Sequence, residues 1–277
     1  MRRVPGLLVL AAAACAPAAD TDTPMLVAAP VAVYTATEYA FSGPDTLSAG
    51  ATTFRMVSAG QELHHLTLVR FDEGHTLEEF LGVLGNGSPP AWAHFSGGPN
   101  PPVPGEASEA TAVLTPGSWA MICLVPAPDG MPHIAKGMGK AFTVVASSAP
   151  AAEPAAQIVL TLRDYDFDLS TPLTAGTHTI RVENVGAQDH ELVLVKLDEG
   201  KTVQDMASYV DGMEAGTVGG PPPATPMGGI AGMASGGRNW FTVTLTPGEY
   251  GLLCFVPDSG DGRRHTHHGM PRQFTIQ

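Results

Sequence analysis

Two sets of soft and borderline metal ligands recur along this chain. Each set begins with a histidine, continues with a cysteine in an apolar segment, and ends with a histidine and a methionine on the following loop. Two imidazoles and a thiolate in a near-trigonal plane, with a weak thioether above it, suit copper that cycles between Cu(I) and Cu(II). The sequence therefore predicts two copper sites. The candidate ligands are His64, Cys123, His133 and Met138 in the first set, and His190, Cys254, His265 and Met270 in the second.

The two sets occupy equivalent positions of an internal repeat. Residues 35–41 recur as residues 161–167, and the Asp-Glu-Gly turn at 72–74 recurs at 198–200 with the same displacement. Further along, residues 114–126 recur as 245–257. Such self-similarity indicates one domain present twice. The expected organisation is a first domain at 31–146, an Ala/Pro/Ser-rich linker at 147–156, and a second domain at 157–277.

Each copy carries short apolar runs separated by Gly- and Pro-containing turns, which is typical of strands. After each Asp-Glu-Gly turn, the spacing of Thr76 to Glu79, and of Thr202 to Asp205, predicts one short capped helix. The expected fold is all-β, with two tandem Greek-key β-sandwiches that each include one short helix. In the second copy, strands are expected at 158–162, 177–183, 191–196, 240–245, 251–256 and from residue 274.

At the ligand-bearing residues the sequence resembles the cupredoxin, or blue copper, family. The segment Pro-Gly-x-Trp/Tyr-x-x-x-Cys leads to His and Gly-Met in both copies, and residues 184–190 precede an apolar strand. Both features are similar to the ligand-bearing segments of plastocyanin-like domains. The spacing from Cys to His exceeds that of plastocyanin and azurin, and is similar to that of the type 1 site of copper nitrite reductases.

This resemblance implies that each copy holds one type 1 copper ion bound by its set of ligands. It implies single-electron transfer, with Met138 or Met270 tuning the potential through a weak axial bond. His133 and His265 would form the exposed edge through which electrons pass to a redox partner, such as a cytochrome or another copper protein.

A multicopper enzyme is disfavoured. In oxidases and copper nitrite reductases, a histidine next to the type 1 cysteine reaches a second copper centre, whereas Ile122 and Leu253 stand there in this chain. The trinuclear centre of the oxidases uses eight histidines, more than remain. We therefore expect an electron carrier or copper-binding protein and not a catalyst. The unassigned histidines are His65, His75, His94, His178, His267 and His268.

Other interpretations of the same residues remain open. Cys123 and Cys254 could form a disulfide, if their Cα atoms came within about 7 Å. They could also be buried apolar residues of a metal-free interaction module. With copper bound, the protein could buffer or carry the metal and not transfer electrons. His65 could replace its neighbour His64 as a ligand, but the repeat places Glu191 opposite it, which favours His64.

Two further segments could contribute ligands or contacts. His267 and His268 could serve as alternative ligands or as a docking patch for a redox partner. Met227 and Met233 could recruit copper through thioethers, but the Pro- and Gly-rich stretch 221–233 is expected to be a mobile loop.

The N-terminus predicts export. Arg2 and Arg3 precede an apolar run that is too short to span a bilayer, so residues 1–14 are expected to be a signal peptide. The run ends in Ala-Ala-Ala-Cys15, which resembles a bacterial lipobox. Lipidation of Cys15, a disordered tether at 15–30 and a membrane-anchored periplasmic or cell-surface location follow from this interpretation; ordinary cleavage near Ala14 or Ala19 is the alternative.

The charge balance excludes one class of partner. The chain carries 27 Asp and Glu against 14 Lys and Arg, a formal net charge of −13. Binding to nucleic acids draws its affinity from basic side chains that neutralise phosphates. We therefore expect no nucleic-acid partner.

Overall fold

A computed structural model describes residue 1 and residues 28–84, 89–218 and 220–277 of the 277-residue chain. Cys15, with most of the predicted signal peptide and tether, lies outside the described residues. Within the part of the chain that is described, no helix has the length and apolar character needed to cross a membrane.

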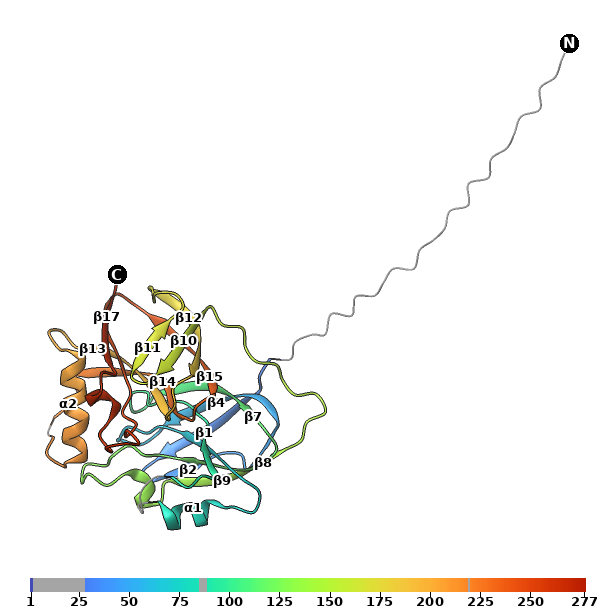
Figure 1. Ribbon diagram of the computed structural model, residues 1–277, viewed down its shortest axis with the longest axis horizontal. Coiled ribbons are helices and arrows are strands. Elements are labelled where there is room, and N and C mark those ends of the chain that lie inside the picture. The colour runs from blue at the N-terminus through green and yellow to red at the C-terminus, as the bar shows by residue number, and fades with distance from the viewer. Residues whose placement is uncertain (2–27, 85–88, 219) are drawn as a thin grey trace.

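In the described residues the fold is built from strands, with one α-helix and one short 3-10 helix in each half (Figure 1). The predicted all-β class is confirmed. The N-terminal half contains β1 (Val31–Thr37), β2 (Ala40–Ser42), β3 (Thr46–Ser48), β4 (Gly50–Ser58), β5 (Thr67–Phe71), α1 (Leu77–Val83), β6 (Ala93–Phe95), β7 (Ala107–Leu114), β8 (Gly117–Ile122), η1 (His133–Lys136) and β9 (Gly139–Val145). The C-terminal half contains β10 (Ile158–Arg163), β11 (Asp166–Leu169), β12 (Gly176–Asn184), β13 (His190–Leu197), α2 (Val203–Glu214), β14 (Ala224–Met233), β15 (Arg238–Leu245), β16 (Gly248–Leu253), η2 (His265–His267) and β17 (Pro271–Ile276).

Both predicted helices begin where the sequence places them. The Thr76 hydroxyl accepts the backbone N–H of Glu79, and the Glu79 carboxylate accepts the N–H of Thr76. Thr202 and Asp205 form the same reciprocal pair at the start of α2. These bonds satisfy N–H groups that have no partner inside the helix, so the local sequence fixes the first turn.

Alternation of buried and exposed residues turns one face of each strand to the core. In β1 the pattern places Ala32, Tyr34 and Ala36 inside, with their neighbours outside or partly exposed. This two-residue period is the signature of a strand packed on one face. Each half has two core clusters, and the larger one includes the cysteine and the methionine of its candidate ligand set.

The two halves share one sheet. Its strand order is β11-β10-β12-β15-β7-β4-β1-β2, with β15 of the C-terminal half paired to β7 of the N-terminal half through Asn239↔Ala112 and Trp240↔Thr111. The second layer is separate in each half: β14-β13-β16-β17 in one and β3-β9-β8-β5-β6 in the other. The sandwiches therefore have a common layer, which the sequence did not reveal.

A second junction corrects one expectation. Most of the stretch 221–233, expected to be a mobile loop, is strand β14, which pairs with β13 and forms bridges to Ser96 and Pro99 of the N-terminal half. The glycines that suggested a loop instead permit close packing of backbone. At Gly229, φ is +119° and a Cβ would overlap the carbonyl oxygen of Leu192, so this strand requires glycine.

Candidate metal centres

The structure brings His64, Cys123 and His133 together. The Nδ1 atoms of His64 and His133 lie 3.1 Å apart, and Cys123 Sγ lies 3.4 Å from His133 Nδ1. All three side chains are 0% exposed. They come from three segments: the chain just before β5, the residue after β8, and the first residue of η1.

His190, Cys254 and His265 form the equivalent cluster in the C-terminal half. Cys254 Sγ lies 3.8 Å from His190 Nδ1 and 3.4 Å from His265 Nδ1, and these residues are also 0% exposed. Cys254 again directly follows a strand, β16, and His265 again opens a 3-10 helix. The same donor set therefore recurs with the same atoms facing inward.

These separations fit a single metal ion. Bonds of about 2.0–2.3 Å to nitrogen and sulfur, arranged near-tetrahedrally, separate the ligand atoms by about 3.3–3.8 Å. The Nδ1 and Sγ distances in both clusters agree with this range to within a few tenths of an ångström. A thiolate with two imidazoles is a soft to borderline set that suits copper or zinc. The residues present therefore fit a bound metal.

Met138 and Met270 stand beside the two clusters. Each is fully buried and lies one residue before the last strand of its half. The Met138 N–H donates to the carbonyl of His133 at 3.0 Å, and the Met270 N–H donates to that of His265 at 3.1 Å. These bonds place the backbone of each methionine against the loop that carries the second histidine.

The two loops between cysteine and histidine differ by one residue, yet they close in the same way. The His133 N–H donates to the carbonyl of Val125, and the His265 N–H donates to that of Val256, both at 3.0 Å. The longer second loop takes up its additional residue in the turn closed by Asp258 N–H and Arg263 O. The additional residue therefore lies at a distance along the loop from the candidate ligands.

Carboxylates accept hydrogen bonds from the Nε2 atoms of two of the imidazoles, on the side of the ring opposite Nδ1. His133 Nε2 donates to Glu62 Oε2 at 2.8 Å, and His190 Nε2 donates to Asp164 Oδ1 at 2.5 Å. A proton held on Nε2 leaves Nδ1 as a lone-pair donor, which is the tautomer that a metal at Nδ1 needs. Weaker approaches of 3.6 Å and 4.0 Å place Glu38 near His64 Nε2 and Asp258 near His265 Nε2.

Burial sets the ionisation of the metal-free clusters. It raises the pKa of the Cys123 thiol to about 12 and raises that of Cys254 as well. Burial, and then the neighbouring His190, lower the pKa of His265 to about 4. Without a cation, the Cys123 thiol is therefore protonated and the His265 ring neutral at pH 7. A bound cation lowers the pKa of the cysteine thiol, because the negative charge of the thiolate is then paired with the positive charge of the metal.

A tyrosine covers each cluster, which corrects one expectation. The ring of Tyr39 lies 5.0 Å from that of His133, and the ring of Tyr165 lies 5.1 Å from that of His265. Their hydroxyls donate to Glu62 and Asp258, respectively. Neither histidine is exposed, so the prediction that His133 and His265 form a solvent-facing edge is wrong. The repeated Glu/Asp-Tyr pair in the sequence was the signal for this cover.

His65 does not replace His64. Its Nε2 accepts the N–H of Leu124 at 2.7 Å, on the residue after the cluster cysteine. Glu191 does the same in the other half, where its Oε1 accepts the N–H of Phe255 at 2.9 Å. Sequence comparison of the halves aligned these two residues but did not show this shared role. Each holds the cysteine segment against the segment that carries the first histidine.

The other candidate ligands lie elsewhere. His267 pairs with Asp211 of α2 at 3.2 Å, and His268 pairs with Asp261 at 3.1 Å. Met227 packs against the core of the C-terminal half, and Met233 is buried in it. Cys123 and Cys254 are both free, so the disulfide alternative does not hold for the described cysteines.

A third group of potential ligands, Asp258, Asp261 and His268, has a structural explanation. Asp258 Oδ1 accepts the backbone N–H groups of Gly260 and Asp261, while Oδ2 accepts from Tyr165 and Gln188. These bonds account for the low pKa of Asp258, with the Tyr165 hydroxyl as the main cause. The group therefore holds the loop together.

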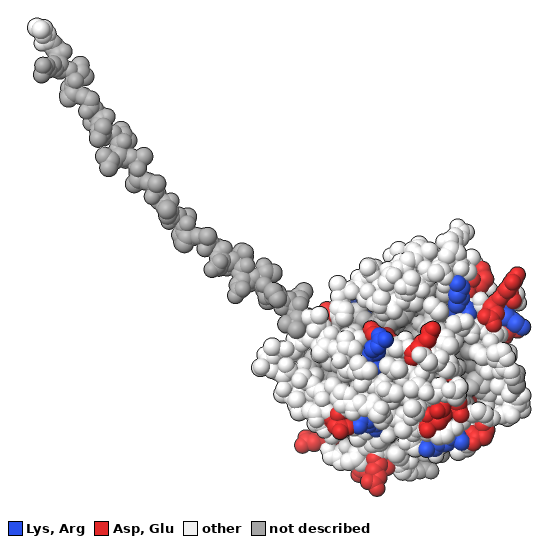
Figure 2. All heavy atoms as spheres, turned by 180° about the vertical axis from the view of Figure 1, so that it is seen from behind, with Lys and Arg blue, Asp and Glu red and all other residues white. Residues whose placement is uncertain are grey.

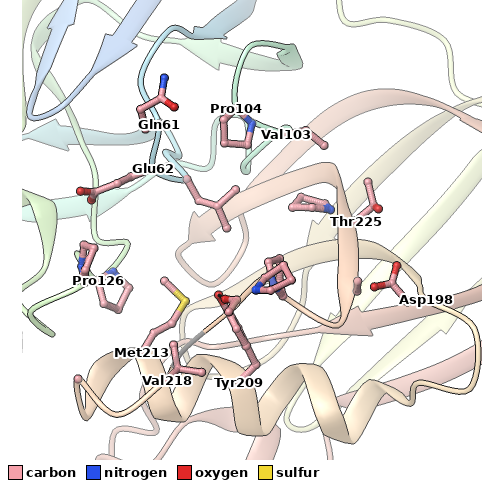
Figure 3. A pocket seen from close by; sticks show the side chains of 18 residues that line it. Gln61, Glu62, Val103, Pro104, Pro126, Asp198, Tyr209, Met213, Val218 and Thr225 are labelled. Carbon is pink, nitrogen blue, oxygen red and sulfur yellow. Dashed lines mark hydrogen bonds between the residues drawn. The ribbon is translucent and has the colours of Figure 1, made fainter.

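A cleft of about 590 Å³ lies beside the first cluster, between the two halves (Figure 3). Glu62 and Pro126 line it from the N-terminal half, and Tyr209 and Met213 of α2 line it from the other. Glu62 thus lines the cleft and also contacts the candidate ligand His133. On the face drawn in Figure 2, acidic and basic side chains are scattered over a largely uncharged surface.

No protein-family model and no curated protein matches this sequence. Among solved structures, it is similar to reduced auracyanin from Roseiflexus castenholzii, with 18% identity and a TM-score of 0.29 over 43% of this chain and 99% of that one. It is similar to copper nitrite reductase from Nitrosomonas europaea, with 14% identity and a TM-score of 0.26 over 91% and 94%. A multicopper oxidase matches with 14% identity and a TM-score of 0.24 over 89% and 88%. Similarities this distant do not assign a function to the chain.

Proposed function

We propose that this protein is an exported single-electron carrier, built from two tandem cupredoxin-like domains that each bind one copper ion in a type 1-like site. The ligands would be His64, Cys123, His133 and Met138 in domain 31–146, and His190, Cys254, His265 and Met270 in domain 157–277. The observation that carries the proposal is the duplicated inward convergence of two Nδ1 atoms and one Sγ.

When bound, copper supplies a one-electron couple, because thiolate and thioether stabilise Cu(I) while imidazole serves both oxidation states. The chain supplies a rigid frame. Each cysteine follows a strand, and each second histidine is fixed by a backbone bond to a residue two positions after that cysteine. Carboxylates hold the outer nitrogens of His133 and His190. Ligands held in this way change position little when the charge of the site changes, which favours electron transfer.

Electrons would enter or leave through the tyrosine that covers each site, because neither His133 nor His265 is exposed. At the first site, Tyr39 and Glu62 are partly exposed and both contact His133. Tyr165 lies in the same position over His265. We expect a redox partner, such as a cytochrome or another copper protein, to approach over these residues. Export, lipidation of Cys15 and a periplasmic or cell-surface location remain part of this proposal.

The test is the visible spectrum of the mature protein with added Cu(II). An intense charge-transfer band is expected from each thiolate. Cys123→Ser should remove one component, Cys254→Ser the other, and the double variant all of it. A colourless protein, or a band that survives in the double variant, would refute the proposal.

Copper buffering or carriage is the second candidate. Complete burial of all six histidine and cysteine ligands favours retention of the ion, as a buffering protein requires. The two functions differ in exchange: an electron carrier oxidises and reduces repeatedly without releasing metal. Repeated cycling with a soluble cytochrome, with the copper content measured before and after, separates them.

A further inference from the structure

A largely buried arginine ties the second candidate centre to helix α2. Arg264 directly precedes the candidate ligand His265, and its side chain is 11% exposed. Its Nη1 donates to Oδ1 of Asp211 at 2.8 Å, and its Nη2 lies 2.9 Å from Oε2 of Glu214. Both acids belong to α2. Because the guanidinium is a rigid planar fork, contact with two carboxylates fixes its orientation as well as its position.

The two acids stand where the helix alone disfavours them. Asp211 and Glu214 lie in the last turn of α2. The C-terminal end of a helix carries a partial negative charge, so acidic side chains there are unfavourable unless a cation faces them. Arg264 supplies that cation from 53 residues further along the chain than Asp211. The tertiary contact therefore accounts for this placement, and local helix preference does not.

The same guanidinium faces the residue that follows the cluster cysteine. Arg264 Cζ lies 5.9 Å from the centre of the Phe255 ring, within the range of a cation–π contact. Phe255 directly follows Cys254, and it packs against the core cluster that contains the buried face of α2. Arg264 therefore connects the two ends of the ligand loop, one at Cys254 and the other at His265.

Asp211 also approaches the segment after the second histidine. Its Oδ2 lies 3.2 Å from Nε2 of His267, two positions beyond His265. One carboxylate thus contacts side chains on both sides of a candidate ligand, with one oxygen for each. The N–H of His265 is itself bound to the carbonyl of Val256. This segment cannot move away from α2 without breaking these contacts.

The repeat shows that the fold does not require this arrangement. Pro132 stands in the first half where Arg264 stands in the second, and proline has no charged side chain. In the first loop Lys136 pairs with Asp129, so that ion pair closes the loop on itself. Both halves nevertheless gather the same His-Cys-His group. The contacts of Arg264 are therefore a feature of the second centre alone.

Resting on the proposed function, we propose that Arg264 is a positioning residue of the second centre. Held by Asp211 and Glu214, it fixes His265 relative to Cys254 and slows the release of the metal. Release requires that a ligand swing away while the segment around it opens. A segment bound to a packed helix by two ion pairs opens less often, so the donor atoms stay in place for longer.

The experiment uses the mature chain in a Cys123→Ser background, which leaves the second centre as the site under test. Co(II) is the probe, because a thiolate bound to it absorbs in the visible range. The loaded protein is mixed with an excess of chelator, and the loss of the band gives the release rate. Arg264→Gln removes the charge and the fork. We expect release about tenfold faster or more, with a shifted band that reports altered ligand geometry.

Three further variants separate the contacts. Asp211→Asn should release as fast as Arg264→Gln, and the double variant no faster than either, because the two partners act as one pair. Glu214→Gln should have a smaller effect, since Glu214 is 65% exposed and Asp211 36%. Arg264→Lys should restore part of the retention, because lysine keeps the charge but lacks the fork. If Arg264→Gln does not fold, Arg264→Lys and Glu214→Gln carry the test.

Arg263→Gln is the matched control. It removes the same charge one position earlier, from an exposed side chain, and should release the metal at the background rate. Equal rates in Arg263→Gln and Arg264→Gln would overturn the proposal. So would additive effects of Arg264→Gln and Asp211→Asn.

A structural role without positioning has its own signature. Arg264→Gln would then lower the urea midpoint of the metal-free protein but leave the band and the release rate unchanged, which also overturns the proposal. Absence of a thiolate band with both Co(II) and Cu(II) in the background protein would instead refute the proposed function. The two failures are therefore distinguishable.

Discussion

His133 and Glu62 form a hydrogen bond of 2.8 Å between Nε2 and Oε2, on the opposite side of the ring from the Nδ1 that faces Cys123. One side chain is thus held by a carboxylate while it presents its other nitrogen to the cluster. Asp164 stands in the same relation to His190. The outer carboxylate therefore fixes both the tautomer and the orientation of the ring.

Glu62→Gln should weaken metal binding at the first centre. The amide can turn its oxygen to the ring but carries no charge, so the imidazole becomes a poorer donor. We expect a loss of about 10–100-fold in Cu(I) affinity, measured by competition with a chelator in a Cys254→Ser background. Glu73→Gln, at an exposed position, is the control. An affinity equal to that of the parent would show that the carboxylate does not tune the site.

Metal should stabilise the folded chain. A metal that binds only the native state, at about 1,000 times its dissociation constant, adds about 4 kcal/mol to the free energy of unfolding. We expect Cu(I) or Zn(II) to raise the denaturation midpoint of the parent protein and to lose this effect in the Cys123→Ser, Cys254→Ser double variant. An equal shift in both proteins would place the metal elsewhere.

Acid should destabilise the cover of the first centre. The backbone N–H groups of Glu62 and Gln61, with Glu62 as the larger influence, lower the pKa of the Glu38 carboxyl from 4.5 to about 2. A lowered folded-state pKa gives stability that is fully present above pH 4.5 and is lost as the pH falls toward 2. Glu38→Gln should be less stable than the parent above pH 4.5, and the gap should close on acidification.

Denaturant unfolding of the metal-free protein at several pH values measures this gap. Glu73→Gln again serves as the control, because Glu73 is an exposed residue of the turn before α1. A gap that stays constant from neutral pH down to 2 would contradict the assignment of the stabilisation to the ionised Glu38.

Gly229→Ala should damage the junction between the halves. A Cβ there would overlap the carbonyl oxygen of Leu192, and φ is +119°. Steric overlap and backbone strain together should cost about 2–4 kcal/mol. Gly236→Ala is the control, since its φ of +80° is also positive but the space around it is open; it should cost about 1 kcal/mol. If a urea titration gave the same loss of unfolding free energy for Gly229→Ala and Gly236→Ala, backbone strain alone would account for the effect at Gly229.

The sequence alone predicted the parts whose signals are local or repeated. Both α-helices start at their Thr caps, because a capping box needs only four consecutive residues. The strand class followed from alternation and turns. The eight candidate ligands could be listed because the same residue types recur at matching positions, and the structure gathers both His-Cys-His groups. That they bind copper stays a prediction.

Contacts between distant segments could not be obtained in this way. Burial of His133 and His265 depends on Tyr39 and Tyr165, which lie about a hundred residues earlier in the chain. The same holds for Arg264 against Asp211, and for β7 against β15. Such contacts arise only when strands choose partners across the whole chain. Local propensity therefore determined which segments are strands and helices, while sheet pairing and packing decided what covers each centre and what holds its ligands.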